Sequence, residues 1–174
     1  MAQLSETTES RVTLQSIAAG DEEFLFQVYA STRVEELAAC EWSEPQRENF
    51  LRMQFQAQDK HYRENYPGAT LQIINVDGEC AGRLYVHRRK NEIRVMDIAL
   101  LPIYRRRGIG TALMDRILFE GAKTDKSVTI HVEIFNPALC WYERLGFKKI
   151  AVNGPYYLME RTVVKDACLD EVQS

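Results

Sequence analysis

Apolar and polar residues alternate in short runs along much of the chain, which is typical of β-strands with one buried face. Asp77-Gly78 separates two of these runs and is a strong signal for a two-residue hairpin turn. Asn91 then turns the chain into a third run, so the three runs together predict an antiparallel meander. The strands are expected over residues 11–18, 69–76, 79–89, 92–101, 128–135, 147–152 and 156–163.

Between these strands, apolar residues recur at three- and four-residue spacing, which predicts amphipathic helices. Asp21 is placed to cap the first helix, and Ser43 with Gln46 has capping-box spacing at the start of the second. Gly146 is placed to end the last helix. The helices are expected over residues 20–32, 43–68, 108–123 and 137–146.

The resulting order is β-α-α-β-β-β-α-β-α-β-β, which predicts an α+β fold. We expect a mixed, mostly antiparallel sheet of about seven strands, flanked by about four helices. Residues 11–163 are expected to form a single domain. Residues 1–10 and 164–174 are polar and are expected to be flexible ends.

Composition narrows the class of protein. A chain of 174 residues with a formal charge of -3 lacks the basic excess of a general nucleic-acid binder. No signal peptide and no apolar run of membrane-spanning length is evident, so no membrane partner is expected. The cysteines lie far apart without C-x-x-C spacing, which predicts free thiols in a reducing, cytoplasmic setting and no metal site. They are Cys40, Cys80, Cys140 and Cys168.

Local chemistry is concentrated where Arg105, Arg106 and Arg107 run into Gly108-Ile109-Gly110 and a helix begins. The first helical N–H groups lack partners within the helix, and the helix dipole adds positive charge there. Glycines let the backbone approach a ligand closely, so the stretch predicts an anion site suited to the phosphates of a cofactor. Leu113 stands where a dinucleotide fingerprint needs a third glycine, and no Lys-Ser/Thr pair of a P-loop follows.

Two segments taken together indicate a protein family more specifically than the glycine turn alone. "DIALLPIYRRRGIGTALM" followed by "HVEIFNPALCWYERLGF" resembles the GNAT family, the Gcn5-related N-acetyltransferases. The first family signature corresponds to Arg105-x-x-Gly108-x-Gly110 after an apolar strand and a proline. The second corresponds to Asn136, then Tyr142, then Leu-Gly-Phe at 145–147. The resemblance extends over residues 11–163, because the expected element order also agrees with that fold.

The resemblance implies an acetyl-CoA-dependent N-acetyltransferase that moves an acetyl group to a primary amine by direct attack on the thioester. It assigns the end of the 92–101 strand to the pantetheine arm, where a phase break after Val95 fits a β-bulge. It assigns Asn136 to a hydrogen bond with the same arm and Tyr142 to protonation of the leaving thiolate. The implied cofactor-binding residues are Ile98, Ala99, Leu100, Arg105, Arg106, Arg107, Gly108, Ile109, Gly110, Thr111, Asn136 and Tyr142.

The amine must be neutral to attack, so a base or a water chain leading to one is expected. Several family members carry a Glu or His on the strand before the glycine turn. The inward positions here are Arg94 and Met96, and Asp97 is out of phase by simple alternation. His131 and Glu133, on one face of the following strand, are the candidates, with a bound-water relay as an equal rival.

Ordinary structural roles compete with these assignments. The arginine run also fits a solvated turn, Tyr142 a core aromatic and His131 a strand residue. Asn136 also fits a helix cap, alone or in addition to binding the cofactor. The aromatic residues of the acceptor-side helices fit either an acceptor pocket or core packing, and Cys140 is given no nucleophile role. Those aromatic residues are Trp42, His61 and Tyr62.

Two other functions remain open on the sequence. A non-catalytic acyl-CoA-binding sensor or interaction module would explain the missing acid on the 92–101 strand. A Rossmann-type oxidoreductase is opposed by Leu113 and by the hairpin meander. The acceptor amine is not specified, although the acidic "VEELAACEWSE" suits a cationic amine. A homodimer is common in the family.

Overall fold

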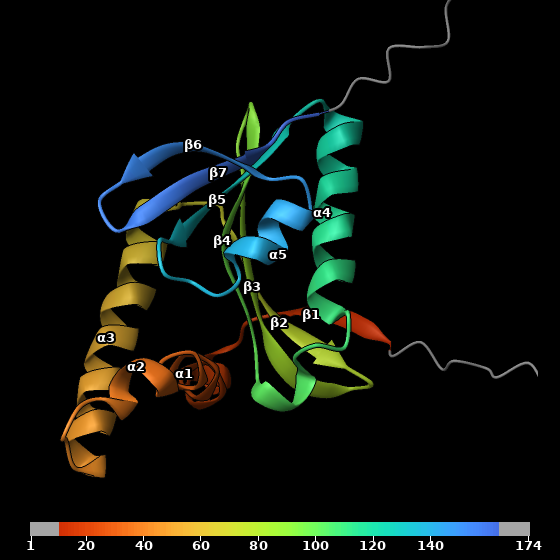
Figure 1. Cartoon of the computed structure of the whole chain (residues 1–174). Helices are drawn as coiled ribbons and strands as arrows, with labels where there is room; N and C mark the ends of the chain where they lie inside the picture. The colour runs from red at the N-terminus through yellow and green to blue at the C-terminus, as the bar shows by residue number, and fades with distance from the viewer. Residues whose placement is uncertain (1–10, 164–174) are drawn as a thin grey trace, which may run out of the picture. The chain divides into compact units, whose positions relative to one another are not determined.

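The computed structural model describes residues 11–163, which pack as two compact units. The N-terminal unit comprises the chain up to Tyr85 together with Asp97–Gly110. The C-terminal unit comprises Val86–Met96 together with the chain from Thr111 onward. Figure 1 labels the elements of both units. The predicted flexible ends and Cys168 lie outside the described residues.

Seven strands form a sheet with the order β1-β2-β3-β4-β5-β7-β6. The β1–β2, β5–β7 and β6–β7 pairs are antiparallel, whereas β4 and β5 are parallel. The predicted α+β class with a mixed, mostly antiparallel sheet is therefore confirmed, and each predicted strand is present. The strands are β1 (Val12–Ser16), β2 (Thr70–Val76), β3 (Glu79–Arg88), β4 (Glu92–Leu100), β5 (Ser127–Glu133), β6 (Lys148–Asn153) and β7 (Tyr156–Arg161).

All four predicted helices are present, and a short helix α2 is additional. Its five residues are too few to show helical periodicity in the sequence. No helix of residues 11–163 is long and apolar enough to cross a membrane. The helices are α1 (Glu22–Ser31), α2 (Val34–Ala38), α3 (Glu44–Asn65), α4 (Ile109–Thr124) and α5 (Leu139–Arg144), with 3-10 turns at Ala19–Asp21 and Pro102–Tyr104.

The predicted helix caps have mixed outcomes. The capping box at the start of α3 is confirmed, since the Ser43 backbone N–H donates to Gln46 Oε1 at 2.9 Å. Asp21 makes no side-chain hydrogen bond to α1, so that predicted cap is wrong. Its carboxylate accepts the Ala18 N–H at 2.7 Å instead, because a 3-10 turn precedes the helix.

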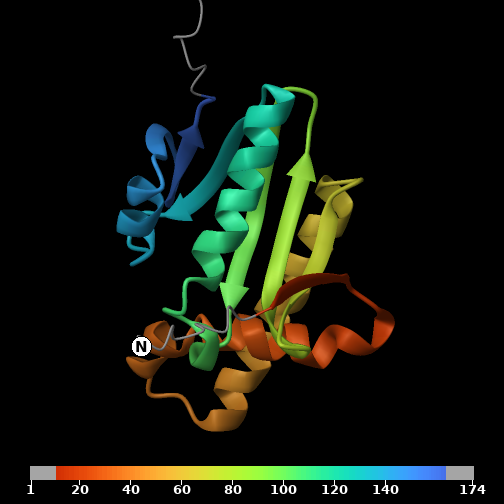
Figure 2. The same ribbon diagram turned by 90° about the vertical axis from the view of Figure 1, so that its right-hand side faces the viewer.

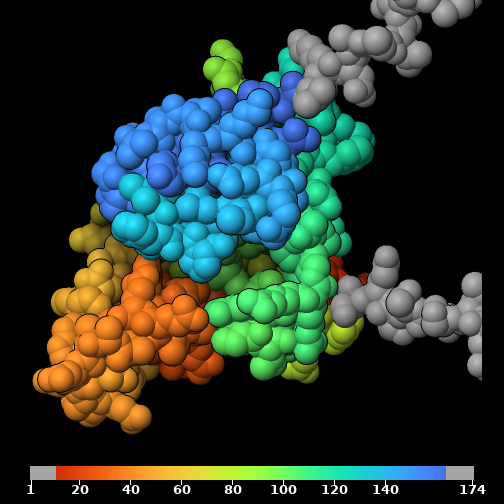
Figure 3. Space-filling view, in the orientation of Figure 1, coloured from red at the N-terminus to blue at the C-terminus, as the bar shows by residue number. Residues whose placement is uncertain are grey.

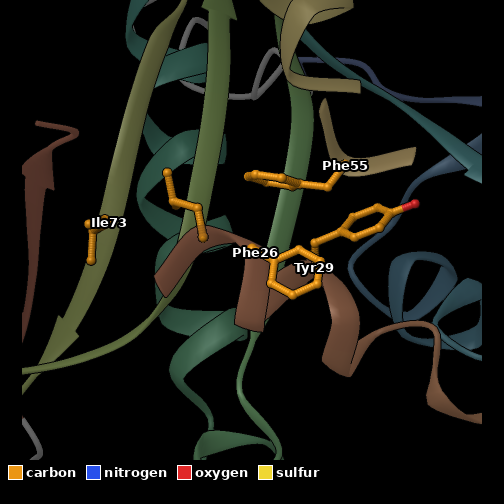
Figure 4. Packing of buried hydrophobic residues seen from close by; sticks show 5 residues of the cluster. Phe26, Tyr29, Phe55 and Ile73 are labelled. Carbon is orange, nitrogen blue, oxygen red and sulfur yellow. The ribbon is translucent and has the colours of Figure 1, made fainter. Parts of the chain in front are cut away.

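Aromatic packing between α1, α3 and β2 forms a core cluster of the N-terminal unit (Figure 4). Phe55 meets Phe26 edge-to-face, with ring centroids 5.8 Å apart. It is also the buried residue of α3, so this contact fixes the helix against the unit. Leu25, Phe26, Tyr29, Phe55 and Ile73 make up the cluster.

In the C-terminal unit, apolar side chains of α4 and α5 and of β5 and β7 are buried. Figure 2 shows α4 as one uninterrupted helix, and Figure 3 shows the atoms of α5, β6 and β7 in blue at the surface. The buried set includes Leu113, Met114, Ile117, Val128, Ile130, Val132, Tyr142, Phe147 and Met159. The three cysteines of the described chain, Cys40, Cys80 and Cys140, are free thiols, as predicted.

The ends of β3 and β4 approach unusually closely within the N-terminal unit. A Cβ at Gly82 would lie 2.1 Å from the Ala99 carbonyl oxygen and 2.9 Å from a methyl carbon of Leu100. The Leu101 N–H donates to the Ala81 carbonyl at 2.8 Å just beyond this point. A glycine inside a strand is typical of a bulge or a close backbone approach. The bulge expected in β4 stays a prediction. Only glycine fits here.

We expect Gly82→Ala to lower the free energy of unfolding by about 1–3 kcal/mol, because the methyl group forces β3 and β4 apart. Urea denaturation followed by circular dichroism measures the change. Gly20→Ala is the matched control, since a Cβ at Gly20 meets nothing within 4 Å. Equal stability of the two variants would contradict the close approach.

Candidate functional site

The turn before α4 has the backbone conformation of an anion-binding loop. Arg106 and Gly108 both lie in the left-handed region, with φ of 59° and 76°. Left-handed residues alternating with ordinary ones turn successive N–H groups toward one side, which forms a concave nest for an anion. At Gly108 the positive φ, rather than a neighbouring atom, requires glycine, because an added Cβ would meet nothing within 4 Å.

The three arginines of the turn differ in whether their guanidinium groups make hydrogen bonds within residues 11–163. The Arg105 Nε donates to the Leu100 carbonyl at 2.8 Å, and its Nη2 donates to the Ser31 carbonyl at 3.2 Å and hydroxyl at 3.1 Å. Its guanidinium therefore fastens the turn to the ends of β4 and α1. Arg106 and Arg107 are exposed, and these two cations are available to an anion.

At the start of α4, backbone N–H groups rather than side chains are placed to contact a ligand. The Ile109 side chain is buried in the N-terminal unit, so only its backbone can meet a ligand. In the C-terminal unit, Thr111 Oγ1 accepts a hydrogen bond from Trp141 Nε1 at 3.1 Å. This bond ties the first turn of α4 to α5, the helix that carries Tyr142.

The predicted site residues belong to both units. Ile98, Ala99, Leu100, Arg105, Arg106, Arg107, Gly108, Ile109 and Gly110 lie in the N-terminal unit, and Thr111, His131, Glu133, Asn136 and Tyr142 lie in the C-terminal unit. Ile98, Ala99 and Leu100 are the half-buried last residues of β4, directly before the turn.

Asn136 lies three residues before the start of α5. Its Oδ1 accepts the Ala138 N–H at 2.8 Å, in the turn that leads into the helix. The N-cap of α5 is Ala138, which makes no side-chain capping bond, so the predicted cap at Asn136 is wrong. The bond from the Ala138 N–H occupies only the carbonyl end of the Asn136 amide. The Nδ2 group makes no hydrogen bond within residues 11–163 and keeps two donors for a ligand.

Tyr142 is a core residue of the C-terminal unit, with 5% of its surface exposed. Its ring centroid lies 4.7 Å from that of Trp141 and 5.9 Å from that of Phe147. The ring therefore has the packing role that the sequence also allowed. This packing fixes the direction of the Cβ–ring axis, so the hydroxyl has a defined position.

His131 and Glu133 lie on one face of β5, two residues apart, as predicted. His131 Nε2 is 3.3 Å from the side-chain amide nitrogen of Asn153, a geometry that suits an unprotonated Nε2 accepting from the amide. Burial, and then the positive charge of Arg94, lower the pKa of His131 below its ordinary value of 6.5. The imidazole is therefore neutral near pH 7 and able to accept a proton.

A polar network beside His131 was missed by sequence reasoning. Thr129 Oγ1 donates to Glu92 Oε2 at 2.8 Å, and Arg94 forms an ion pair with Glu92 at 3.2 Å. Burial acts to raise the pKa of the Glu92 carboxyl, but the Thr129 bond and the neighbouring arginines outweigh it and hold the pKa low. The parallel register pairs Arg94 with Thr129, and no sequence pattern gives that register.

Comparison with known proteins agrees with this geometry. Residues 67–149 match the family described as Acetyltransferase (GNAT) domain. The match includes the glycine turn, β5 and α5.

An N-alpha-acetyltransferase of Saccharolobus solfataricus is 39% identical over 67 residues, which are 36% of this chain and 40% of that protein. The match thus spans less than half the length of this curated relative. The structure of PaiA N-acetyltransferase from Thermoplasma acidophilum in complex with coenzyme A aligns with a TM-score of 0.67 at 18% identity, over 87% of this chain and 99% of that one. Ard1 from Thermoplasma volcanium gives a TM-score of 0.58 at 21% identity, over 88% and 99%.

The two structural likenesses establish the fold of the chain. Within that fold, residues 67–149, which carry the left-handed glycine turn, Asn136 and Tyr142, match the GNAT domain of acetyltransferases.

Proposed function

We propose that the protein is an acetyl-CoA-dependent N-acetyltransferase acting on a primary amine. The observation that carries this proposal is the turn before α4, whose left-handed backbone and exposed Arg106 and Arg107 suit a pyrophosphate. The curated relative named N-alpha-acetyltransferase supports an α-amine as the acceptor. We expect residues 11–163 to act as one domain. That the protein forms a homodimer and lies in the cytoplasm stays a prediction.

The residues present fit acetyl-CoA. The N–H groups of Gly108, Gly110 and Thr111, with the Arg106 and Arg107 side chains, would hold the pyrophosphate. The backbone of residues 98–100 and the free Asn136 Nδ2 would hold the pantetheine arm. When bound, acetyl-CoA supplies an activated acetyl group and a thiolate leaving group.

His131 is the proposed proton acceptor for the attacking amine, because it is neutral and half-buried. Glu133 on the same face and a bound-water relay are the alternatives. Tyr142 is the proposed proton donor to the thiolate, since a phenol is protonated at neutral pH and can give up its proton as the negative charge develops.

Calorimetric titration with acetyl-CoA, with NAD as the control ligand, tests the cofactor. Thiol release from acetyl-CoA in the presence of n-butylamine, tri-alanine or spermidine then tests the transfer. Micromolar acetyl-CoA binding with amine-dependent release supports the proposal. Binding without release over the whole panel would favour the acyl-CoA-binding module instead.

Replacing both Arg106 and Arg107 by Ala is expected to weaken acetyl-CoA binding by about 10- to 100-fold, because two charge-assisted contacts to phosphate are lost. Calorimetry at low ionic strength measures the dissociation constant. Lys123→Ala, which removes a cation from the last turn of α4, is the control. An unchanged constant in the double variant would remove both arginines from the site.

Tyr142→Phe is expected to lower kcat by about 10²- to 10⁴-fold while acetyl-CoA affinity is retained. The phenyl ring preserves the packing on Trp141 and Phe147, so the loss reports the hydroxyl alone. Steady-state thiol release gives kcat, and Tyr156→Phe controls for a surface tyrosine of the same unit. Normal turnover would show that Tyr142 is not the proton donor.

The acid limb of the pH–rate profile is expected below pH 6.5, because the pKa of His131 is lowered and the base works in its neutral form. Removing the Arg94 charge in Arg94→Met should raise that pKa and move the limb to higher pH. Profiles of kcat/KM for the wild type, Arg94→Met and His131→Asn measure this. A limb that survives in His131→Asn but disappears in Glu133→Gln would assign the base to Glu133.

A further inference from the structure

The N-terminal unit contains a buried ion pair that the proposed function does not use. Arg83 of β3 has 3% of its side chain exposed, and its Nη2 donates to Asp97 Oδ2 of β4 at 2.5 Å. The same nitrogen donates to Gln58 Oε1 of α3 at 2.9 Å. Burying two charges costs about as much as their attraction returns, so stability alone is a weak reason for such a pair.

The carboxylate of the ion pair is more exposed to solvent than the guanidinium and, within the described chain, has a free acceptor oxygen. The Asp97 side chain is 16% exposed, compared with 3% for Arg83. Only Oδ2 is engaged, and Oδ1 makes no hydrogen bond to any residue between 11 and 163. A carboxylate can accept about four hydrogen bonds, so Asp97 presents an unused acceptor at the edge of a buried cluster.

The surroundings of the pair contain two more unmatched polar atoms. Tyr85 Oη and Arg83 Nε are buried, and neither has a hydrogen-bond partner among residues 11–163. The Arg83 guanidinium carbon lies 5.2 Å from the Tyr85 ring centroid, and Tyr62 packs edge-on to Tyr85 at 5.8 Å. Burial raises the pKa of Tyr85 to about 12, so its hydroxyl stays protonated and neutral. Unmatched buried polar groups are rare, so these two atoms have room for a partner such as a bound water.

The position of Asp97 in the chain relates this cluster to the proposed reaction. Asp97 directly precedes Ile98, the first of the β4 residues assigned to the pantetheine arm. Its bond to Arg83 also shows that its side chain is directed into the polar cluster, whereas simple alternation gave it no role. The open carboxylate therefore lies one residue from the segment that would carry the acyl arm.

We propose that Asp97 determines acceptor specificity by taking a hydrogen bond from the acceptor amine at Oδ1. This proposal rests on the acetyltransferase function above. Arg83 holds the carboxylate in place, and its guanidinium balances the carboxylate charge. The cluster thus carries no net charge to retain an ammonium ion and suits a neutral primary amine. The amine donates N–H and keeps its lone pair for attack.

Asp97→Asn tests the assignment. The Asn carbonyl would accept from Arg83, which turns the amide NH2, a donor, toward the amine. We expect the KM for the best acceptor among n-butylamine, tri-alanine and spermidine to rise by about 10- to 100-fold, with unchanged acetyl-CoA affinity. Calorimetric titration of the same amine into the CoA-loaded protein should show the same loss.

Gln58→Leu is the matched control, because it removes a hydrogen bond to the same Arg83 nitrogen and leaves the carboxylate in place. Its amine KM is expected to stay within about threefold of the wild type, since a neutral partner of the guanidinium contributes little net binding. Where Asp97→Asn fails to fold, the double variant Arg83→Met/Asp97→Leu removes both charges together with the acceptor oxygens and should show the same loss of amine binding.

The outcomes separate this proposal from the proposed function. An Asp97→Asn protein with wild-type amine KM overturns the specificity role and leaves acetyl transfer standing. Equal losses in Asp97→Asn and Gln58→Leu, or a parallel loss of acetyl-CoA affinity, would also overturn it, because they indicate a structural role. A wild type that binds acetyl-CoA but neither binds nor acetylates any amine of the panel overturns both.

Discussion

The Arg105 guanidinium makes the contacts that hold the turn before α4 in place within the N-terminal unit. One planar group bonds the Leu100 carbonyl at the end of β4 and the Ser31 carbonyl and hydroxyl at the end of α1. Its rigid fork of donors suits three acceptors at once in a way that a lysine ammonium does not. With the turn fastened at Arg105, the left-handed residues 106 and 108 can present their N–H groups in a fixed arrangement.

Much of the fold follows from local sequence patterns. The Asp77-Gly78 turn has both residues at positive φ, 52° and 89°, as a tight hairpin requires. The Ser43–Gln46 capping box likewise depends on neighbours in the chain. Helix α2 was missed because five residues carry too little periodicity, and the cap at Asp21 was displaced by a 3-10 turn that no pattern indicates.

In the candidate site, too, residues in short local motifs could be predicted from the sequence, whereas contacts between distant residues could not. The glycine turn, Asn136 and Tyr142 lie in contiguous motifs, so the sequence could indicate them. The Arg83–Asp97 pair joins residues 14 positions apart, and the Glu92–Thr129 bond joins residues 37 apart. Such contacts depend on strand register and on the close approach of Gly82 in β3 to the end of β4, which a single sequence does not encode in any short pattern.

Each unit contains charges that are paired within the protein near a residue proposed to act on the amine. In the C-terminal unit, burial and Arg94 lower the pKa of His131, while Glu92 forms ion pairs with both Arg89 and Arg94. In the N-terminal unit, Asp97 balances Arg83, and burial keeps the Tyr85 hydroxyl protonated. A strongly anionic site would hold the acceptor as ammonium and so withhold its lone pair. In the proposed reaction, internally paired charges would orient the amine without stabilising its protonated form, so ion pairing within the protein would favour acetyl transfer at neutral pH.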